Sequence, residues 1–250
     1  MSEAPILELT ETTVPTRRDP DIAALSGVNW AVRPGEFWVV GGPMNSGKSD
    51  LMFLLAGLAR PSRGAYRLFG HDMTQPLGDE FIPCRQRVGM VFDDARLFNH
   101  LTIAENVGLP ARYHNDLHED EVAAWVGALL RTTEVAEFTS NTPGMLARNW
   151  RRRVALARAL ALRPELLLLE NPLRGLDALH ASWWIEFLRQ LWRGHDLMQG
   201  RATTIVVTAD DLDPWHAGDM RFATLHGQTM VTTSHGASSD KAGTTKTEDN

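Results

Sequence analysis

Short apolar runs alternate with amphipathic segments along the chain. Four runs have the length of a strand and little polar alternation, as expected for strands covered on both faces: 37-FWVVG-41, 88-VGMVF-92, 166-LLLL-169 and 204-TIVVT-208. Helical patterns are predicted at 48-KSDLMFLLAGLAR-60, 119-EDEVAAWVGALLR-131, 151-RRRVALARALALR-163 and 181-ASWWIEFLRQLWR-193. Pro61 and Pro164 follow the first and third of these segments and mark helix ends. This order of elements predicts an α/β fold with a mainly parallel sheet.

The end of the chain has a different composition. Residues 232–250 are rich in Ser, Thr, Gly and charged side chains and contain no large apolar residue. Such a segment cannot bury enough apolar surface to offset the entropy of ordering. We therefore predict one folded domain over residues 1–231, followed by a disordered tail.

Composition narrows the classes of function. A chain of 250 residues with 43% hydrophobic residues can bury a substantial core. Cys84 is the single cysteine, which excludes a disulfide framework and a cysteine-ligated zinc site. The formal net charge of -6 argues against binding to nucleic acid, because neutralising phosphates needs an excess of Lys and Arg. The sequence has neither a signal-peptide pattern nor a run of roughly 18 apolar residues, so a soluble, cytoplasmic protein is expected.

The most specific motif is 42-GPMNSGKS-49, a glycine-rich loop between an apolar strand and a helix. In such a loop the backbone N–H groups cradle phosphate oxygens, Lys48 reaches the β- and γ-phosphates, and the Ser49 hydroxyl ligates Mg²⁺. The loop predicts binding of a nucleoside triphosphate with Mg²⁺. The candidate contact residues are Gly42, Pro43, Met44, Asn45, Ser46, Gly47, Lys48, Ser49 and Asp50. The loop alone leaves kinase, GTPase, motor and transporter functions open.

Three later segments narrow that choice. In order, 97-LFNHLTIAENV-107, 154-VALARALALRPELLLL-169 and 172-PLRGLD-177 resemble the nucleotide-binding subunit of an ABC transporter, and the resemblance covers about residues 5 to 230. It implies a P-loop NTPase core of the ABC type, with a mainly parallel sheet, an antiparallel β subdomain and an α-helical subdomain inserted at about residues 93–165. The stretch 105-ENVGLPARYHNDLHEDE-121 further resembles the subgroup that serves MCE-type lipid transport, similar to the Mla pathway.

The resemblance also implies cofactors, partners and location. ATP and Mg²⁺ are the expected ligands. The expected partners are a membrane permease, a second nucleotide-binding subunit in a homo- or heterodimer and, for the lipid subgroup, an MCE-domain protein. Such a subunit is cytoplasmic and peripheral on the inner face of the cell membrane.

Several family positions carry other residues here. Glu170 and Asn171 stand where the family has Asp and Glu, and Ala209 stands where it has a histidine that contacts the γ-phosphate. Glu170 keeps a charge that can hold the metal, but an Asn171 amide cannot accept a proton at neutral pH. General-base catalysis contributes about 10² to 10⁴ in rate, so hydrolysis is expected to be slow unless Glu170 substitutes as the base.

Asp93 stands where the family has a glutamine after the strand 88-VGMVF-92. Its carboxylate can ligate the metal, so that the predicted metal set is Ser49, Asp93 and Glu170. The alternative is that Asp93 merely begins a loop, as aspartate often does. Both interpretations remain open at this stage.

The segment 146-LARNW-150 stands where the family signature, Leu-Ser-Gly-Gly-Gln, would lie. The candidate dimer contacts are Ala147, Arg148, Asn149 and, from 174-RGLD-177, Asp177. Arg148 can form charge-assisted bonds to a phosphate and so replace the signature. Alternatively, Arg148 and 151-RRR-153 form a solvated basic start of a helix, which the usual exposure of arginine favours.

The family's aromatic residue that stacks on adenine has no counterpart near 12-TTVPTRRDP-20, which leaves recognition of the base unexplained. Two functional hypotheses follow. The chain is an ATPase subunit that powers a transporter, with the missing groups supplied by Glu170, Arg148 or a partner subunit. Alternatively, it is a nucleotide-binding regulatory or structural subunit that hydrolyses ATP poorly and dimerises with a competent ABC ATPase.

Overall fold

The computed structural model describes residues 3–75, 78–114, 118–216 and 219–233. Within these residues, the larger sheet has the strand order β10-β9-β3-β8-β7-β6. The bounds are β3 Phe37–Gly41, β6 Val88–Val91, β7 Leu166–Glu170, β8 Thr204–Ala209, β9 Arg221–His226 and β10 Thr229–Thr233. Neighbouring strands from β9 to β6 are parallel, and β10 pairs antiparallel with β9. The mainly parallel sheet is therefore as predicted.

A second, antiparallel sheet has the strand order β2-β1-β4-β5. Its strands are β1 Leu7–Pro15, β2 Ala23–Val32, β4 Arg63–Leu68 and β5 His71–Asp72. The pairing of β1 with β2 shifts register between Leu9 and Thr12 and again on either side of Val14. These irregularities break the simple alternation of apolar and polar residues that identifies a strand.

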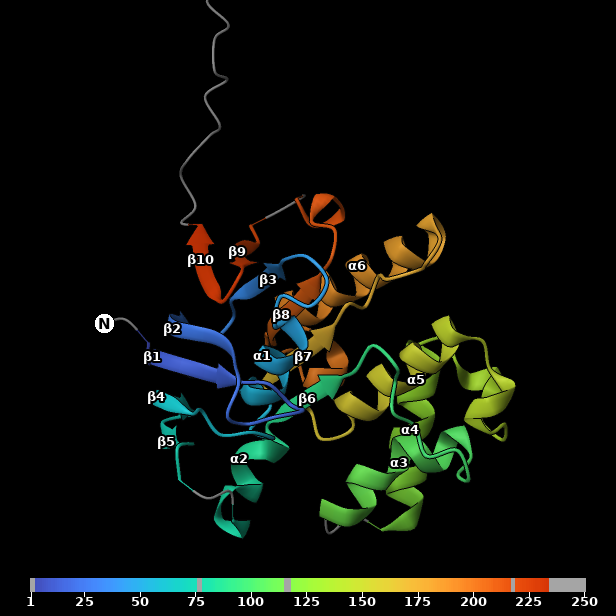
Figure 1. The fold of residues 1–250 in the computed structure, drawn as a ribbon. Helices are drawn as coiled ribbons and strands as arrows, with labels where there is room; N and C mark the ends of the chain where they lie inside the picture. The colour runs from blue at the N-terminus through green and yellow to red at the C-terminus, as the bar shows by residue number, and fades with distance from the viewer. Residues whose placement is uncertain (1–2, 76–77, 115–117, 217–218, 234–250) are drawn as a thin grey trace, which may run out of the picture.

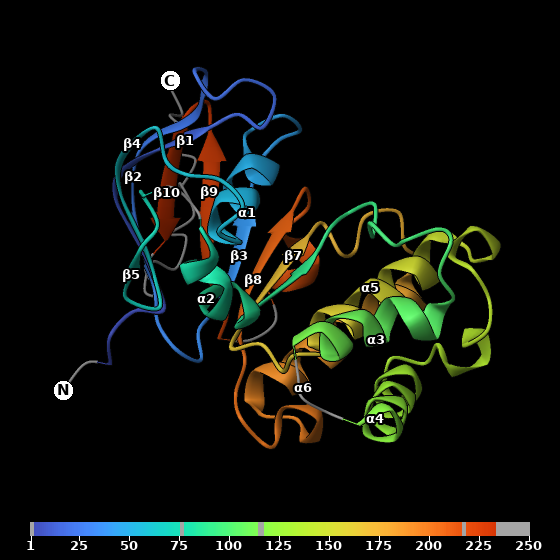
Figure 2. The ribbon, with the colours of Figure 1, turned by 90° about the horizontal axis from the view of Figure 1, so that it is seen from below.

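The helices complete the fold. They are α1 Lys48–Leu55, α2 Ile82–Gln86, α3 Ile103–His114, α4 Glu119–Thr132, α5 Arg148–Leu160 and α6 Ala178–Arg193. Helices α3, α4 and α5 lie together, on the side of the parallel strands away from β1, β2 and β4 (Figures 1 and 2). The predicted combination of parallel core, antiparallel β subdomain and helical subdomain is thus confirmed.

The parallel strands carry a different core on each face. Phe37, Leu167 and Ile205 point into a cluster built with α3 to α6, whereas Trp38, Leu166 and Val206 point into a cluster with α1 and the antiparallel sheet. Successive side chains of a strand face opposite sides, so a central strand with no polar alternation must be covered on both. The unbroken apolar runs of the sequence are explained by this double burial.

Several element boundaries differ from the predictions; helix α6, for example, begins at Ala178 rather than at residue 181. Helix α1 ends at Leu55 rather than near residue 60, because Gly57 adopts a left-handed conformation with φ of 66° and terminates the helix before Pro61. Helix α5 begins at Arg148, earlier than residue 151. The predicted tail from 232 is also wrong at its start, since residues 232–233 belong to β10. Residues 234–250 of that prediction lie outside the described residues.

Within the described part of the chain, no helix combines the length and the hydropathy that crossing a membrane requires.

Candidate functional site

The glycine-rich loop follows β3 and leads directly into α1. Asn45 and Gly47 are left-handed, with φ of 63° and 88°, and the Ser46 N–H donates to the Pro43 carbonyl at 3.2 Å. Asparagine and glycine tolerate this conformation with little strain. Such a curl turns successive N–H groups inward and makes a concave site for an anion at the start of the helix.

Lys48 lies at the base of this loop, and its side chain is only 5% exposed. Its ammonium donates to the carbonyls of Gly42 and Pro43 at 2.6 and 2.7 Å and lies 3.4 Å from Ser46 Oγ. It also forms an ion pair with Asp210, at 3.2 Å between Nζ and Oδ1. A buried ammonium must be paired or hydrogen-bonded, and here the loop and one carboxylate together satisfy it.

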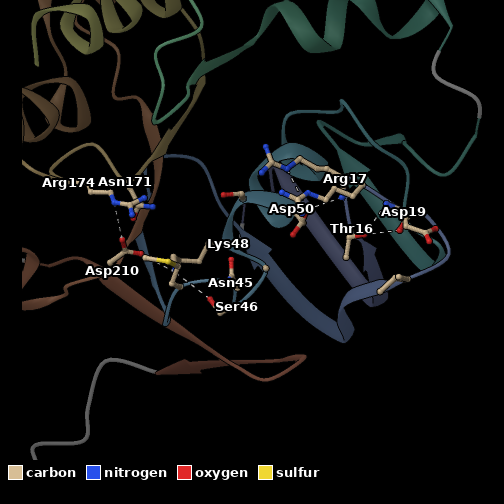
Figure 3. A pocket seen from close by; sticks show the side chains of 15 residues that line it. Thr16, Arg17, Asp19, Asn45, Ser46, Lys48, Asp50, Asn171, Arg174 and Asp210 are labelled. Carbon is tan, nitrogen blue, oxygen red and sulfur yellow. Dashed lines mark hydrogen bonds and ion pairs between the residues drawn. The ribbon is translucent and has the colours of Figure 1, made fainter. Parts of the chain in front are cut away.

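A cavity of about 590 Å³ opens above the loop. Its walls come from four segments: the phosphate loop and the start of α1, the turn after β7, the end of β8, and the β1–β2 loop. The lining side chains include Ser46, Lys48, Ser49, Asp50, Asn171, Arg174 and Asp210. In Figure 3, Arg174 and Asp210 lie at one end of this cavity and Arg17 and Asp50 at the other. The volume is in the range of sites for small organic ligands.

The end of β7 places two of the predicted residues side by side. Glu170 is 7% exposed, and its Oε2 accepts the Asp93 N–H at 3.5 Å. Asn171 has φ of 44°, and its N–H lies within reach of the Thr208 carbonyl and hydroxyl, at 3.1 and 3.2 Å. Among the described residues the buried Asn171 Oδ1 has no hydrogen-bond partner.

Asp93 binds arginines. Its Oδ1 accepts from Arg152, in a short contact, and from Arg148 at 3.1 Å, and its Oδ2 lies 3.3 Å from Arg174 Nη1. Arg152 is 1% exposed, and it also donates to the carbonyls of Asp93 and Arg174 at 3.0 and 2.6 Å. Burial lowers the pKa of the Arg152 guanidinium, and the charge of Asp93 opposes that shift. This arrangement favours the interpretation of Asp93 as a structural loop residue over a metal ligand.

The predicted signature residues form a separate hollow of about 310 Å³ beside α5. Ala147 is the N-cap residue of α5, and Arg148, Asn149 and Asp177 line the hollow with Arg174 and His180. Asp177 caps α6, since its Oδ1 accepts the His180 N–H at 2.9 Å. The prediction that Arg148 and 151–153 form a solvated helix start is wrong for two of them: Arg152 and Arg153 are 1% and 3% exposed.

Ala209 ends β8 and is 5% exposed, so its position offers no polar side chain to the cavity. The next residue does. Asp210 Oδ1 pairs with Lys48, and its Oδ2 lies 3.8 Å from Arg174 Nε. Arg174 therefore lies between two carboxylates, Asp210 and Asp93.

The sequence identified loop residues 42–50, Glu170 and Asn171, and the structure brings them together at one edge of the sheet. Sequence reasoning assigned no role to Arg152, Arg174 or Asp210. One signal was available for Asp210: it directly follows a buried parallel strand, and the carboxyl ends of such strands meet at one edge where ligands bind.

Comparisons with known proteins agree with this geometry. A family model described as ABC transporter matches residues 25–174. The sulfate/thiosulfate import ATP-binding protein CysA of Mycobacterium tuberculosis (strain ATCC 25618 / H37Rv) is 37% identical over 213 residues, covering 84% of this chain and 57% of its own. The spermidine/putrescine import ATP-binding protein PotA of Pseudomonas aeruginosa (strain UCBPP-PA14) is 37% identical over 174 residues, covering 70% and 46%. The chain spans about half the length of these curated relatives.

Solved structures resemble the whole fold. The ATP-binding cassette MJ0796, described as a dimeric post-hydrolysis state bound to ADP and Pi, aligns with a TM-score of 0.80 and 26% identity over 90% of this chain and 98% of its own. The cbiO1 structure from Clostridium perfringens, part of the ABC transporter complex cbiONQ, aligns with a TM-score of 0.75 and 23% identity over 92% and 88%. The second likeness supports the fold alone.

Proposed function

The chain belongs to the ABC transporter family as an ATP-binding cassette, and from that membership we propose that it is the ATP-binding subunit of a transporter, docked on a permease at the cytoplasmic face of a membrane. The observation that carries the proposal is the loop at the end of β3. Left-handed Asn45 and Gly47 curl its backbone around an anion site, and the buried Lys48 ammonium lies at its base.

The residues present suit Mg²⁺ in part. Ser49 lines the cavity, and the buried Glu170 carboxylate ends the neighbouring strand. Asp93 is committed to three arginines, so we keep Ser49 and Glu170 as the metal residues and leave Asp93 out. Among the described residues no three His, Cys, Asp or Glu side chains form a ready metal cluster, which fits an ion that takes other ligands from phosphate and water. Bound Mg²⁺ neutralises charge on the phosphates.

Hydrolysis by this chain is proposed to be slow. Asn171 lines the cavity, but its amide cannot take the proton of an attacking water as a carboxylate base does. Ala209 adds no side-chain donor toward a γ-phosphate. Glu170 is the remaining carboxylate at this edge, although its Oε2 already accepts the Asp93 N–H.

Phosphate release at saturating ATP and Mg²⁺ tests this proposal. We expect a low rate of hydrolysis for the purified chain and a rate about 10- to 100-fold higher in Asn171→Glu. This gain is smaller than a general base can contribute, because the variant still has Ala209 in place of the family histidine. Asn171→Gln is the matched control, since it lengthens the side chain without adding a base. Rapid hydrolysis by the wild type that is abolished in Lys48→Ala would contradict the proposal of impaired hydrolysis. It would still support nucleotide binding at the phosphate loop.

Nucleotide binding is tested separately by titration with a fluorescent ATP analogue. Lys48→Ala should weaken binding by at least about tenfold, because the ammonium is the buried cation at the base of the loop. Arg193→Ala removes an exposed cation at the end of α6 and should leave the affinity unchanged. Equal affinity of the Lys48 variant and the wild type would remove the basis of the phosphate-loop assignment.

A second candidate function rests on the same positions at which the chain differs from the family pattern. A cassette with Asn171, Ala209 and the unusual segment 146–150 suits a regulatory subunit that clamps on ATP and pairs with a competent ATPase. Sedimentation with ATP and EDTA discriminates the two. A stable homodimer favours the first function, and a monomer that dimerises only with a second cassette favours the regulatory one.

The transported substrate is proposed from the relatives. CysA is named for import of sulfate and thiosulfate, and PotA for import of spermidine and putrescine. These names favour import of a small polar solute, and they lend no support to the MCE/Mla lipid subgroup or an MCE-domain partner predicted from 105–121. Purification from the native host with its membrane partners is the test, because an MCE-domain protein in the complex would restore the lipid prediction.

A further inference from the structure

Arg174 lies where the nucleotide cavity meets the hollow beside α5, and it lines both. Its N–H donates to the Asn171 carbonyl at 3.1 Å, and its own carbonyl accepts from Arg152 Nη1 at 2.6 Å. Arg152 is 1% exposed, so a buried side chain holds the backbone of this turn in place. The Arg174 side chain is 44% exposed and therefore reaches the cavity from a fixed backbone.

Asp210 lies between two cations, Lys48 and Arg174 (Figure 3). Its Oδ1 is 3.2 Å from Lys48 Nζ, and its Oδ2 is 3.8 Å from Arg174 Nε. The second distance is longer than a hydrogen bond, so Arg174 gives up only a weak attraction when this carboxylate moves aside. One anionic group thus bridges the two cations, and a phosphate, which has more oxygens than a carboxylate, can take its place.

Positive charge is in excess around Arg174. Asp93 is shared by three guanidiniums, those of Arg148, Arg152 and Arg174. Burial lowers the pKa of the Arg152 guanidinium, and the charges of Arg148 and Arg174 lower it further against the opposing effect of Asp93. With the lysine of the phosphate loop, four cations share two carboxylates in the ion pairs of the described residues, and the neighbouring Glu170 still leaves the carboxylates fewer. Like charges this close repel one another, so a bound anion is favoured here.

The two ends of the cavity differ in charge. At the end formed by the β1–β2 loop, Arg17 is paired with Asp50, with 3.5 Å between Nε and Oδ1. At the other end, beyond Lys48, the cations around Arg174 outnumber their carboxylates (Figure 3). The lysine of a phosphate loop contacts the last two phosphates of a nucleotide. The uncharged nucleoside suits the balanced end, and the terminal phosphate, which carries the most charge, suits the end at Arg174.

We propose that Arg174 binds the terminal phosphate of a nucleoside triphosphate together with Lys48, after that phosphate displaces Asp210 from between the two cations. This inference rests on the proposed function of the site. Ala209 offers no donor to this phosphate, whereas a guanidinium presents two parallel N–H groups to one phosphate. A diphosphate ends before the guanidinium, so Arg174 makes the site prefer ATP to ADP.

The test measures the affinity for ATP and for ADP by calorimetric titration in EDTA, which withholds the metal needed for hydrolysis. Arg174→Gln removes the charge and keeps much of the length; it should bind ATP about tenfold more weakly than the wild type and ADP within about twofold. Arg174→Lys keeps the charge without the planar fork and should lose about threefold for ATP alone, so it carries the test even if the glutamine variant fails to fold. Arg193→Gln, at an exposed position on α6, is the control and should change neither affinity.

A second comparison separates direct contact from an effect through Asp210. If Arg174 only draws this carboxylate away from the phosphate, its loss has no consequence once the carboxylate is gone. We expect Arg174→Gln/Asp210→Asn to bind ATP about tenfold more weakly than Asp210→Asn, with little change for ADP. Equal ATP affinities of these two variants would overturn the inference, as would a loss in Arg174→Gln that is the same for ATP and ADP. Lys48→Ala tests the proposed function independently: weaker binding of both nucleotides keeps that function whatever the result at Arg174, and unchanged binding removes it.

Discussion

The ion pair between Lys48 and Asp210 makes a prediction about affinity. In the structure Asp210 Oδ1 lies 3.2 Å from the Lys48 ammonium, on the cation that is expected to contact phosphate. An incoming phosphate must share or replace this carboxylate, and it must also approach a like charge. We predict that Asp210→Asn, which keeps the shape and removes the charge, binds nucleotide more tightly than the wild type.

The magnitude follows from the geometry. Two unit charges 3.2 Å apart attract by about 5 kcal/mol at an effective dielectric constant of roughly 20. The Asp210 side chain is 38% exposed, so solvent screens much of this attraction, and about 1 to 2 kcal/mol is a realistic remainder. Converted to a binding constant, that is a gain of about 5- to 30-fold.

Isothermal titration with ATP in EDTA measures the effect without a contribution from metal. Asp211→Asn is the matched control, because it removes the same charge from the next residue, while its amide oxygen can still accept the Asp213 N–H now bound at 3.0 Å. The advantage of Asp210→Asn should narrow as salt rises, since ions screen the repulsion between carboxylate and phosphate. If Asp210→Asn binds ATP no more tightly than Asp211→Asn, the view of Asp210 as a competitor for Lys48 fails.

Three further predictions concern stability and reactivity. Asp93→Ala should lower the free energy of unfolding by about 3 kcal/mol in urea denaturation, because the 1% exposed Arg152 loses its counterion; a loss under about 0.5 kcal/mol would contradict this reasoning. The hydrogen bond from Arg87 lowers the pKa of Glu165, so Glu165→Gln should cost less than about 1 kcal/mol at pH 7. The difference in free energy of unfolding between the wild type and Glu165→Gln should disappear as the pH falls through the lowered pKa of Glu165. A difference that persists at lower pH would argue against the pairing of Glu165 with Arg87. Burial raises the pKa of the Cys84 thiol, so the native protein should react with a thiol reagent at pH 8 roughly a hundredfold more slowly than the unfolded chain; comparable rates would show that Cys84 is accessible.

The elements that sequence reasoning recovered are those with a local signal. The strands β3, β7 and β8 show no alternation of apolar and polar residues, because every residue in them is buried. The phosphate loop is recognised from fixed residue types at fixed spacing. The strands of the antiparallel sheet have no such signal. In β1 the left-handed Glu11, with φ of 47°, interrupts the alternation that would have identified the strand.

The arginine cluster could not be predicted because its partners are distant in the chain. Three arginines in a row at 151–153 are typical of an exposed helix start. Arg152 is buried because Asp93, separated from it by 59 residues, supplies the counterion. Arg153 is buried because its guanidinium lies over the Trp183 ring, with 3.6 Å to the ring centre, and pairs with Glu134. Neither set of partners has any sequence signature.

The position of the candidate site follows from the topology of the parallel sheet. Strands β3, β6, β7 and β8 are parallel, so their carboxyl ends lie at one edge of the sheet. The residues that follow these ends are Gly42, Phe92 with Asp93, Asn171 and Asp210. The family pattern points to three of these four positions; at the end of β8 it points to Ala209, the position of the family histidine, rather than to Asp210. The topology accounts for Asp210 without any family pattern, because β8 pairs directly with β3 and the residue that follows β8 therefore lies beside the phosphate loop.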